Sequence, residues 1–234
     1  MKIAISQLAP TTSIEENIKG HLADIHANKE ADIILFPELS ITGYFPSHAK
    51  RHPYDRKDAI FDPFVQLSAE HDIVIAIGFP MKTTELPVIA MQFFFPNGKR
   101  HVHVKTIIHE DEAPYFTSQG SLQTIDYRGV RMLPAICFEA TQEETIRYAL
   151  NQNVDLFLAA VAKDEQGMVK METSTVPLIE SGVTVAVSNA IGEGEGFVAV
   201  GKSYVETSEG KTLIEGNEGL VSVKMKTELP KTQT

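Results

Sequence analysis

The sequence predicts a single, strand-rich α/β domain. Apolar runs of strand length recur along the chain, helical or turn-forming stretches separate them, and 234 residues with 43% hydrophobic content can bury one sizeable core. The expected strands lie at 2–8, 32–37, 72–79, 88–95, 101–105, 130–137, 154–160, 182–188, 197–204 and 219–225.

Four helices are expected between these strands. Each has a start signal, either a side chain that caps free backbone amides or a proline in the first turn. The signals are the capping boxes Ser13-x-x-Glu16 and Thr141-x-x-Glu144, the pair Asp62-Pro63 with Asp62 as N-cap, and Pro177 for a helix around 175–181.

The order of these elements predicts two mixed sheets with helices outside. Strands and helices alternate over 1–80 and 130–190, whereas 86–105 and 197–225 contain consecutive strands with Asn97-Gly98 and Glu209-Gly210 turns. Pro134 lacks an amide for the sheet, so we expect a bulge or an edge there. We expect one domain over 1–225 and a polar C-terminal tail over 226–234.

The charge balance argues against nucleic acid or an anionic membrane as partner. The net charge is −10, and the 21 Lys and Arg residues form no dense basic run. The N-terminal stretch is a short alternating strand without the apolar length of a signal peptide, so we expect a cytoplasmic protein. The single cysteine can form neither an intramolecular disulfide nor a cysteine metal cluster.

Three residues whose side chains can take part in catalysis each follow an apolar strand. Glu38, Lys105 and Cys137 stand at strand ends, where α/β proteins present side chains to a common crevice. Each alone has an ordinary interpretation, because Glu and Lys at strand ends are commonly solvated and a lone Cys is commonly a small buried hydrophobe.

The surroundings of Cys137 favour a working thiolate. A helix beginning at Thr141 places its positive end near the sulfur, and an ammonium such as Lys105 stabilises the thiolate further. A carboxylate such as Glu38 can accept the thiol proton. These residue types are the parts of a nucleophilic hydrolase that lacks histidine.

Several segments resemble, in order, the motifs of the nitrilase superfamily of carbon–nitrogen hydrolases. Matching motifs in the right order are more specific than any one motif, and these cover the chain from Ile3 to about Val223. They are Phe36-Pro37-Glu38-Leu39-Ser40-Ile41-Thr42-Gly43-Tyr44, Lys105 with Glu112-x-x-x-Phe116-x-x-x-Gly120, Ile136-Cys137-Phe138-Glu139, Ser188-Asn189-Ala190-Ile191-Gly192, and Gly201-Lys202-Ser203 followed by Ser208-Glu209-Gly210.

The resemblance implies a nitrilase-like α-β-β-α sandwich that hydrolyses a small amide without a cofactor. It implies Glu38 as general base, Cys137 as nucleophile and Lys105 as the cation that stabilises the oxyanion. Glu112 becomes a second glutamate that positions the amide or relays a proton. The backbone amide of Phe138 is a second oxyanion donor, and Tyr44 and Glu139 join the substrate-binding set.

The sequence departs from the family pattern around the pocket. After Cys137 it keeps the acidic Glu139 but lacks the usual aromatic-Pro-Glu step, and the chain contains no tryptophan. Val176-Pro177-Leu178-Ile179-Glu180 stands where an arginine is common. These changes leave the identity of the substrate open.

Three other signals receive ordinary interpretations. His101 with His103, and His48 with His52, have pair spacing but no evident third ligand, so we expect no metal site. The segment 192–196 carries two glutamates that repel phosphate, and we expect a mobile loop that can line the pocket. Phe93-Phe94-Phe95 indicates a strand buried on both faces.

Two other functions stay open. The same thioester can pass to an amine, which makes an acyltransferase, or the fold can bind a small ligand without turnover. The resemblance also implies a homodimer or higher homo-oligomer, with a small-molecule amide as the other partner.

Overall fold

The computed structural model of the chain describes residues 1–216 and 218–223, so the tail predicted over 226–234 lies outside the described residues. One six-stranded sheet has the order β14-β1-β2-β3-β4-β5. Its strands β1, β2 and β3 are parallel, and the other neighbours are antiparallel. The bounds are β1 (Lys2–Ser6), β2 (Ile33–Leu35), β3 (Val74–Met81), β4 (Val88–Phe94), β5 (Arg100–Val104) and β14 (Glu218–Ser222).

The second six-stranded sheet has the order β13-β12-β9-β8-β7-β6, with β7, β8 and β9 parallel. A separate hairpin follows β9 and consists of β10 (Ile191–Gly194) and β11 (Phe197–Val200). The sheet strands are β6 (Ile125–Tyr127), β7 (Val130–Ile136), β8 (Leu156–Val161), β9 (Thr184–Asn189), β12 (Tyr204–Thr207) and β13 (Gly210–Leu213).

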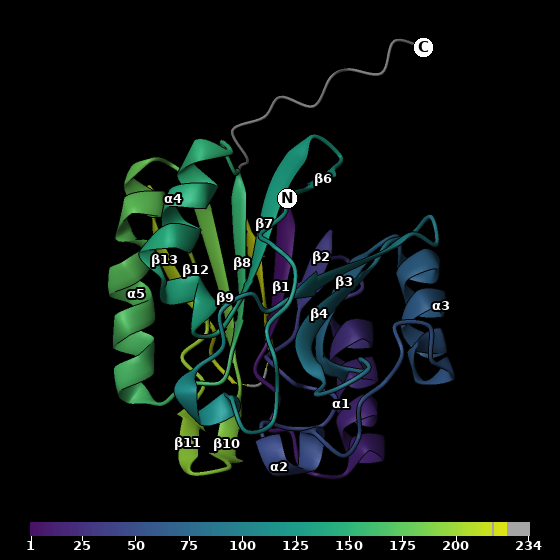
Figure 1. The fold of residues 1–234 in the computed structure, drawn as a ribbon. Coiled ribbons are helices and arrows are strands. Elements are labelled where there is room, and N and C mark those ends of the chain that lie inside the picture. The colour runs from purple at the N-terminus through teal and green to yellow at the C-terminus, as the bar shows by residue number, and fades with distance from the viewer. Residues whose placement is uncertain (217, 224–234) are drawn as a thin grey trace.

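Helices cover the outer faces of both sheets. Figure 1 shows α1 and α3 on one side of the molecule and α4 and α5 on the other, with the two sheets between them. The predicted α-β-β-α sandwich is therefore confirmed. The helices are α1 (Ile14–Ala27), α2 (Pro46–Ala49), α3 (Asp62–His71), α4 (Glu143–Asn151) and α5 (Glu165–Glu180), and the 3-10 turns are η1 (Ala59–Phe61), η2 (Glu110–Glu112) and η3 (Glu139–Thr141).

Two apolar clusters hold these layers together. The larger joins residues of both sheets, and the smaller joins the first sheet to α1 and α3. Phe93 belongs to the larger cluster and Phe94 to the smaller, so the prediction of a strand buried on both faces is confirmed. Fully burying such a side chain contributes on the order of 1.5–3 kcal/mol, which makes these layers the frame of the site.

The helix starts agree with the sequence only in part. The Ser13 side chain caps α1 as predicted, by accepting from the Glu16 amide at 3.4 Å. Asp62 is instead the first residue of α3, whose N-cap is Phe61. The capping box at Thr141 is wrong, because residues 139–141 form η3, the Thr141 hydroxyl donates to the Phe138 carbonyl, and α4 begins at residue 143.

The helix predicted around 175–181 begins much earlier. Asp164 caps α5 by accepting from the Gly167 amide at 2.8 Å, and Pro177 lies inside the helix. Pro177 removes one amide donor, and packing of Met168, Met171 and Leu178 into the core keeps the helix continuous.

The strand predictions need three corrections. The run 197–204 splits into β11 and β12 at Gly201 and Lys202, which both have positive φ. The segment 192–196 is largely part of the β10–β11 hairpin where a loop was expected. β6, β10 and β13 were not predicted as separate strands.

Pro134 lies where the sheet tolerates it. β6 pairs with β7 over 130–132, so among the described strands Pro134 is paired on the β8 side alone, opposite Leu158. The expected edge is confirmed. Within the described residues, every helix is too short or too polar to cross a bilayer.

Candidate active site

Glu38 lies in the turn that follows β2. The next residue, Leu39, has φ of 49°, a left-handed conformation that non-glycine residues adopt at some energetic cost. The Ile41 amide donates to the Gly78 carbonyl on β3 at 3.1 Å, which fastens the turn to the sheet. Glu38 is 1% exposed, so its carboxylate is withdrawn from solvent.

Lys105 follows β5 and connects two carboxylates. Its Nζ donates to Glu38 Oε1 at 2.8 Å and to Glu112 Oε1 at 2.5 Å, and its side chain is fully buried. Burial disfavours the charged lysine, but Glu38 and Glu112 together raise its pKa above the usual range. The ammonium is therefore a permanent positive charge in the site.

Glu112 ends the turn η2 and is held on both oxygens. Oε1 also accepts from the Tyr44 hydroxyl at 2.7 Å, and Oε2 accepts from the His109 amide at 2.7 Å. Burial raises the pKa of Glu112, but Lys105 and these hydrogen bonds bring it below its usual value. Glu112 is therefore an ionised anchor for the lysine.

Cys137 follows β7 at a sharp turn. Its φ is 48°, so a side chain other than glycine is held in the left-handed region, as occurs where a strand-to-turn bend presents a nucleophile. The Cys137 amide donates to the Ala160 carbonyl at 3.0 Å, and Sγ lies 3.8 Å from the Ala162 carbonyl. The backbone thus fixes where the sulfur stands.

The surroundings of Cys137 in the resting site oppose the thiolate that the sequence favoured. Burial and the nearby Glu38 carboxylate raise the pKa of the thiol to about 11, although Lys163 and Lys105 lower it in part. The short 3-10 turn η3 follows the cysteine where the amino end of a longer helix was expected, so the helix dipole stabilises a thiolate less than predicted. The charge of Lys105 is already shared by two carboxylates, so the thiol keeps its proton at neutral pH.

Glu38 has the properties of a base that can accept the proton of the Cys137 thiol. Burial raises its pKa to about 7, against the opposing effect of Lys105. An interaction with the Cys137 side chain is among the contacts that stabilise its ionised form. Glu38 Oε2 accepts no hydrogen bond from the described residues, so this oxygen is open to receive a proton.

Phe138 presents an unused donor beside the sulfur. Within the described residues its amide donates no hydrogen bond, and the residue lines the same cavity as Cys137. An unpaired amide next to a nucleophile can stabilise an oxyanion.

Glu139 differs from the substrate-contacting position expected for it. It is fully buried, and its two oxygens accept from the His103 ring at 2.8 Å, the Ile136 amide at 2.8 Å, and the amide and hydroxyl of Thr106 at 2.8 and 2.5 Å. All four contacts are with protein, so Glu139 fastens the cysteine turn to the segment that follows Lys105.

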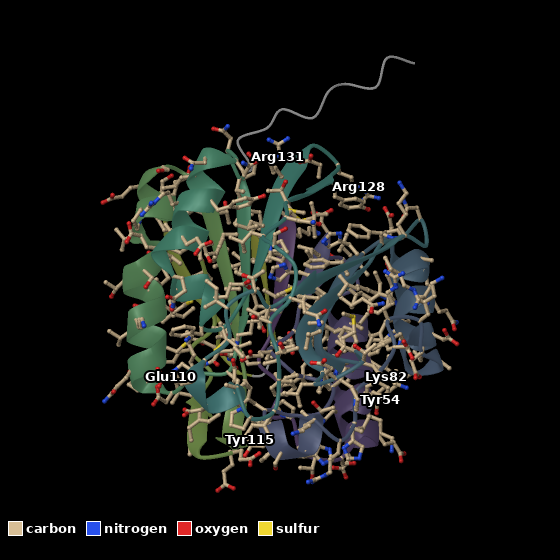
Figure 2. All side chains as sticks on the ribbon, viewed as in Figure 1. Tyr54, Lys82, Glu110, Tyr115, Arg128 and Arg131 are labelled. Atoms are coloured by element: carbon tan, nitrogen blue, oxygen red, sulfur yellow. The ribbon has the colours of Figure 1, made fainter. Side chains whose placement is uncertain are left out.

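A cavity of about 540 Å³ opens in front of the sulfur. Figure 2 labels Tyr115, one of its lining residues, at the end of the molecule where Figure 1 shows α2 and the β10–β11 hairpin. As the sequence suggested, the 192–196 segment contributes to its wall. The lining residues are Tyr44, Pro46, His109, Asp111, Glu112, Tyr115, Cys137, Phe138, Ala162, Lys163, Asp164, Gly167, Lys170, Glu195, Gly196 and Phe197.

Sequence reasoning missed Lys163 in this cavity. It comes two residues after β8, as Glu38, Lys105 and Cys137 follow their own strands. The same strand-end rule would have found it. Within the described residues, no cluster of three His, Cys, Asp or Glu side chains has the arrangement of a metal site, and His103 bonds Glu139.

A family model described as "Carbon-nitrogen hydrolase" matches residues 2–226. Among curated proteins, the glutamine-dependent NAD(+) synthetase of Acinetobacter baylyi is 24% identical over 227 residues. That match covers 92% of this chain and 41% of the synthetase, so the chain spans about two fifths of that relative's length.

Solved structures share the fold at low identity. An amidase from Nesterenkonia sp. AN1, with the acetamide moiety of fluoroacetamide added covalently at its active-site cysteine, superposes with a TM-score of 0.82 and 20% identity, covering 94% of this chain and 88% of that one. A Xanthomonas campestris CN-hydrolase superfamily protein with an arsenic adduct in the active site gives a TM-score of 0.86 and 15% identity, covering 96% and 90%.

Proposed function

The chain belongs to the carbon–nitrogen hydrolase family, and we propose that it hydrolyses the C–N bond of a small amide through a thioester on Cys137. One observation carries the proposal. The only cysteine of the chain lines a cavity together with Glu112, while Glu38 and Glu112 share the buried ammonium of Lys105.

The first step forms the thioester's carbon–sulfur bond. Because the resting thiol is protonated, Glu38 Oε2 accepts its proton as the sulfur attacks the amide carbon. The carbonyl π electrons move onto oxygen, and Lys105 and the Phe138 amide stabilise that negative charge. Loss of one such donor typically costs on the order of 10²- to 10³-fold in rate.

The second step breaks the C–N bond. Protonated Glu38 gives its proton to the amide nitrogen, which leaves as ammonia or an amine while the carbonyl reforms on the thioester. Water then attacks the thioester, Glu38 takes a water proton, and the sulfur leaves and is reprotonated. Glu112 keeps Lys105 in place throughout.

The neighbours in the comparisons support an amide as substrate, because the Nesterenkonia protein is named an amidase and carries an acetamide group on its cysteine. The synthetase activity of the longer curated relative is not part of the proposal. Burial of Glu38 and Lys105 in one bonded cluster favours turnover over ligand binding alone.

The test is ammonia release from a panel of small amides and one or two nitriles. We expect wild type to release ammonia and free acid in equal amounts without an added acceptor, and Cys137→Ala to lose at least about 10³-fold in rate. A slow substrate should leave one acyl adduct on wild type, visible by mass spectrometry and absent from Cys137→Ala. Ser208→Ala, on an exposed turn, is the control.

Two outcomes would change the proposal. Acid release that requires an amine or other acceptor would indicate an acyltransferase. Retained turnover in Cys137→Ala, or no turnover and no adduct across the panel, would reject the hydrolase.

A further inference from the structure

Lys163 is a cation without a partner in the catalytic cavity. Within the described residues its ammonium forms no hydrogen bond or ion pair, although the residue lines the cavity. Its positive charge lowers the pKa of the Cys137 thiol, against the larger effect of burial. Lysines on protein surfaces are commonly solvated, so an unpaired lysine does not by itself indicate a ligand site.

Each acidic residue of the same wall has a hydrogen-bond or ion-pair contact of its own. Asp164 accepts from the Gly167 amide at 2.8 Å, Glu195 accepts from the Ser47 amide at 2.9 Å, and Asp111 lies 3.4 Å from the His109 ring. The fourth acidic lining residue, Glu112, is bound to Lys105. Lys170, the other lysine of the lining, lies over the Phe138 ring at 5.3 Å from its centroid. Within the described residues, Lys163 is therefore the lining lysine whose ammonium has no hydrogen bond, ion pair or ring contact.

The backbone of Lys163 is fixed by one side chain from β9. Asn189 accepts from the Lys163 amide at 2.8 Å and donates to the Lys163 carbonyl at 3.0 Å. The Val200 amide adds a bond to the same carbonyl at 3.1 Å. A residue clamped on both backbone groups presents its side chain from a defined point.

Gly167 makes room for the stem of Lys163. A Cβ at Gly167 would lie 3.0 Å from Lys163 Cβ and 3.1 Å from its Cγ, closer than ordinary contact. The lysine stem thus runs along the first turn of α5, whose positive end adds to the favourable potential for an anion.

We propose that Lys163 binds a carboxylate on the acyl part of the substrate, so that the preferred substrate is a small amide that also carries a carboxylate. This inference rests on the proposed function. The acyl part is assigned because it becomes attached to Sγ, and Lys163 directly follows Ala162, whose carbonyl lies 3.8 Å from that sulfur. The carboxylate is then only a few bonds from the scissile carbon.

The first test needs no substrate. Iodoacetate and iodoacetamide alkylate the same thiolate, each forming a sulfur–carbon bond as the carbon–iodine bond breaks and iodide leaves. They differ mainly in charge. Because the chain has one cysteine, mass spectrometry of the intact protein reports on Cys137 alone.

The measured quantity is the ratio of the two alkylation rates. We expect Lys163→Gln to lower the iodoacetate-to-iodoacetamide ratio about tenfold, the low end for a charge-assisted hydrogen bond, and Lys163→Arg to keep most of it. A shift in the thiol pKa changes both rates equally and leaves the ratio untouched. Lys202→Gln, whose lysine is paired with Glu165 outside the cavity lining, controls for net charge.

The second test uses amides. Wild type should favour monoamides of short dicarboxylic acids over neutral amides of the same length in kcat/KM, and Lys163→Gln should lose this preference while neutral amides change little. An unchanged alkylation ratio in Lys163→Gln, an equal fall in Lys202→Gln, or a wild-type preference for neutral amides would overturn the proposal.

The two tests separate this inference from the proposed function. If no amide is hydrolysed but the ratio depends on Lys163, the anion site stands and the hydrolase fails. If amides are hydrolysed and the ratio does not change, the hydrolase stands and the anion site fails.

Discussion

Gly78 on β3 is in backbone contact with Glu38. A Cβ at Gly78 would stand 3.0 Å from the carbonyl carbon of Glu38, 2.6 Å from the Leu39 nitrogen and 2.5 Å from the Pro37 oxygen. These are backbone atoms of the turn that carries the carboxylate, so they cannot move aside as a side-chain end can. The position of Glu38 depends on the absence of a side chain on the neighbouring strand.

Gly78→Ala should therefore displace the base. We expect a loss of about 1–3 kcal/mol in the free energy of unfolding from overpacking, and a fall in turnover that exceeds what partial unfolding explains. Gly20→Ala is the matched control, because its Cβ would meet a side-chain end of Leu8 at 3.1 Å within a helix, where alanine is favoured. Thermal melts and kcat/KM measure both effects, and wild-type kinetics in Gly78→Ala would contradict the role of this contact.

The activity should depend on pH through Glu38. Its pKa, which burial raises to about 7, means that the carboxylate is increasingly protonated below that pH and cannot accept the thiol proton. We expect kcat/KM to rise with pH up to and through about 7, and Glu38→Gln to lose activity at every pH while its fold stays intact. An acidic limb near the usual carboxyl value of 4.5 would argue that Glu38 is not the base.

Tyr44 should act through Glu112. Tyr44→Phe removes the 2.7 Å hydrogen bond to Glu112 Oε1, which loosens the carboxylate that holds Lys105. A loss of about 1 kcal/mol predicts a fall of roughly fivefold in kcat/KM. Tyr54→Phe is the control because Tyr54 is not part of the cavity lining. Equal effects of the two substitutions would exclude a specific role for Tyr44.

Replacing Glu139 should change the free energy of unfolding more than it changes substrate binding. Burial raises its pKa, but His103 and Thr106 lower it below the usual value, so folding is favoured by ionised Glu139 above the unfolded pKa and this contribution is lost as the pH falls. Glu139→Gln should lower the free energy of unfolding by about 1–3 kcal/mol at pH 7. The free energy of unfolding of Glu139→Gln should also fall less steeply than that of wild type as the pH drops below about 4.5.

Chemical unfolding at pH 7 and pH 4 measures both effects. Glu144→Gln, an exposed acid on α4, is the control for removing one carboxylate. An unchanged unfolding free energy in Glu139→Gln, with a large rise in KM, would restore the substrate-contacting role.

We propose that the outer face of α5 contributes to a homodimer. Val169 and Val176 are 57% and 46% exposed on that helix, and a surface hollow of about 1000 Å³ lies beside the neighbouring α4. Sedimentation at micromolar concentration should show a dimer in wild type and a monomer after Val169→Glu with Val176→Glu. Val198→Glu, at 56% exposure on the β10–β11 hairpin, should leave assembly unchanged. A monomeric wild type would contradict the proposal.

The sequence by itself determined the layers and the residue types that are proposed to react. Period-two and continuous apolar runs follow from burial, which is a local property of each strand, so the strands and the residues at their ends could be read in order. Glu38, Lys105 and Cys137 were identified this way together with their resemblance to a known family. The boundary near Gly201 and the start of α5 were not, because competing local signals are decided by which side chains the core accepts.

Only the tertiary structure decided how the charges are shared. Lys105 meets Glu38 across 67 residues of sequence, and Glu139 meets His103 across 36. Because a buried charge takes its pKa from its partners and from the loss of water, the protonated Cys137, the raised pKa of Glu38 and the full engagement of Glu139 depend on these distant contacts. Lys163 was found for the same reason, since only the folded chain shows that this residue lines the cavity and forms no ion pair with a described carboxylate.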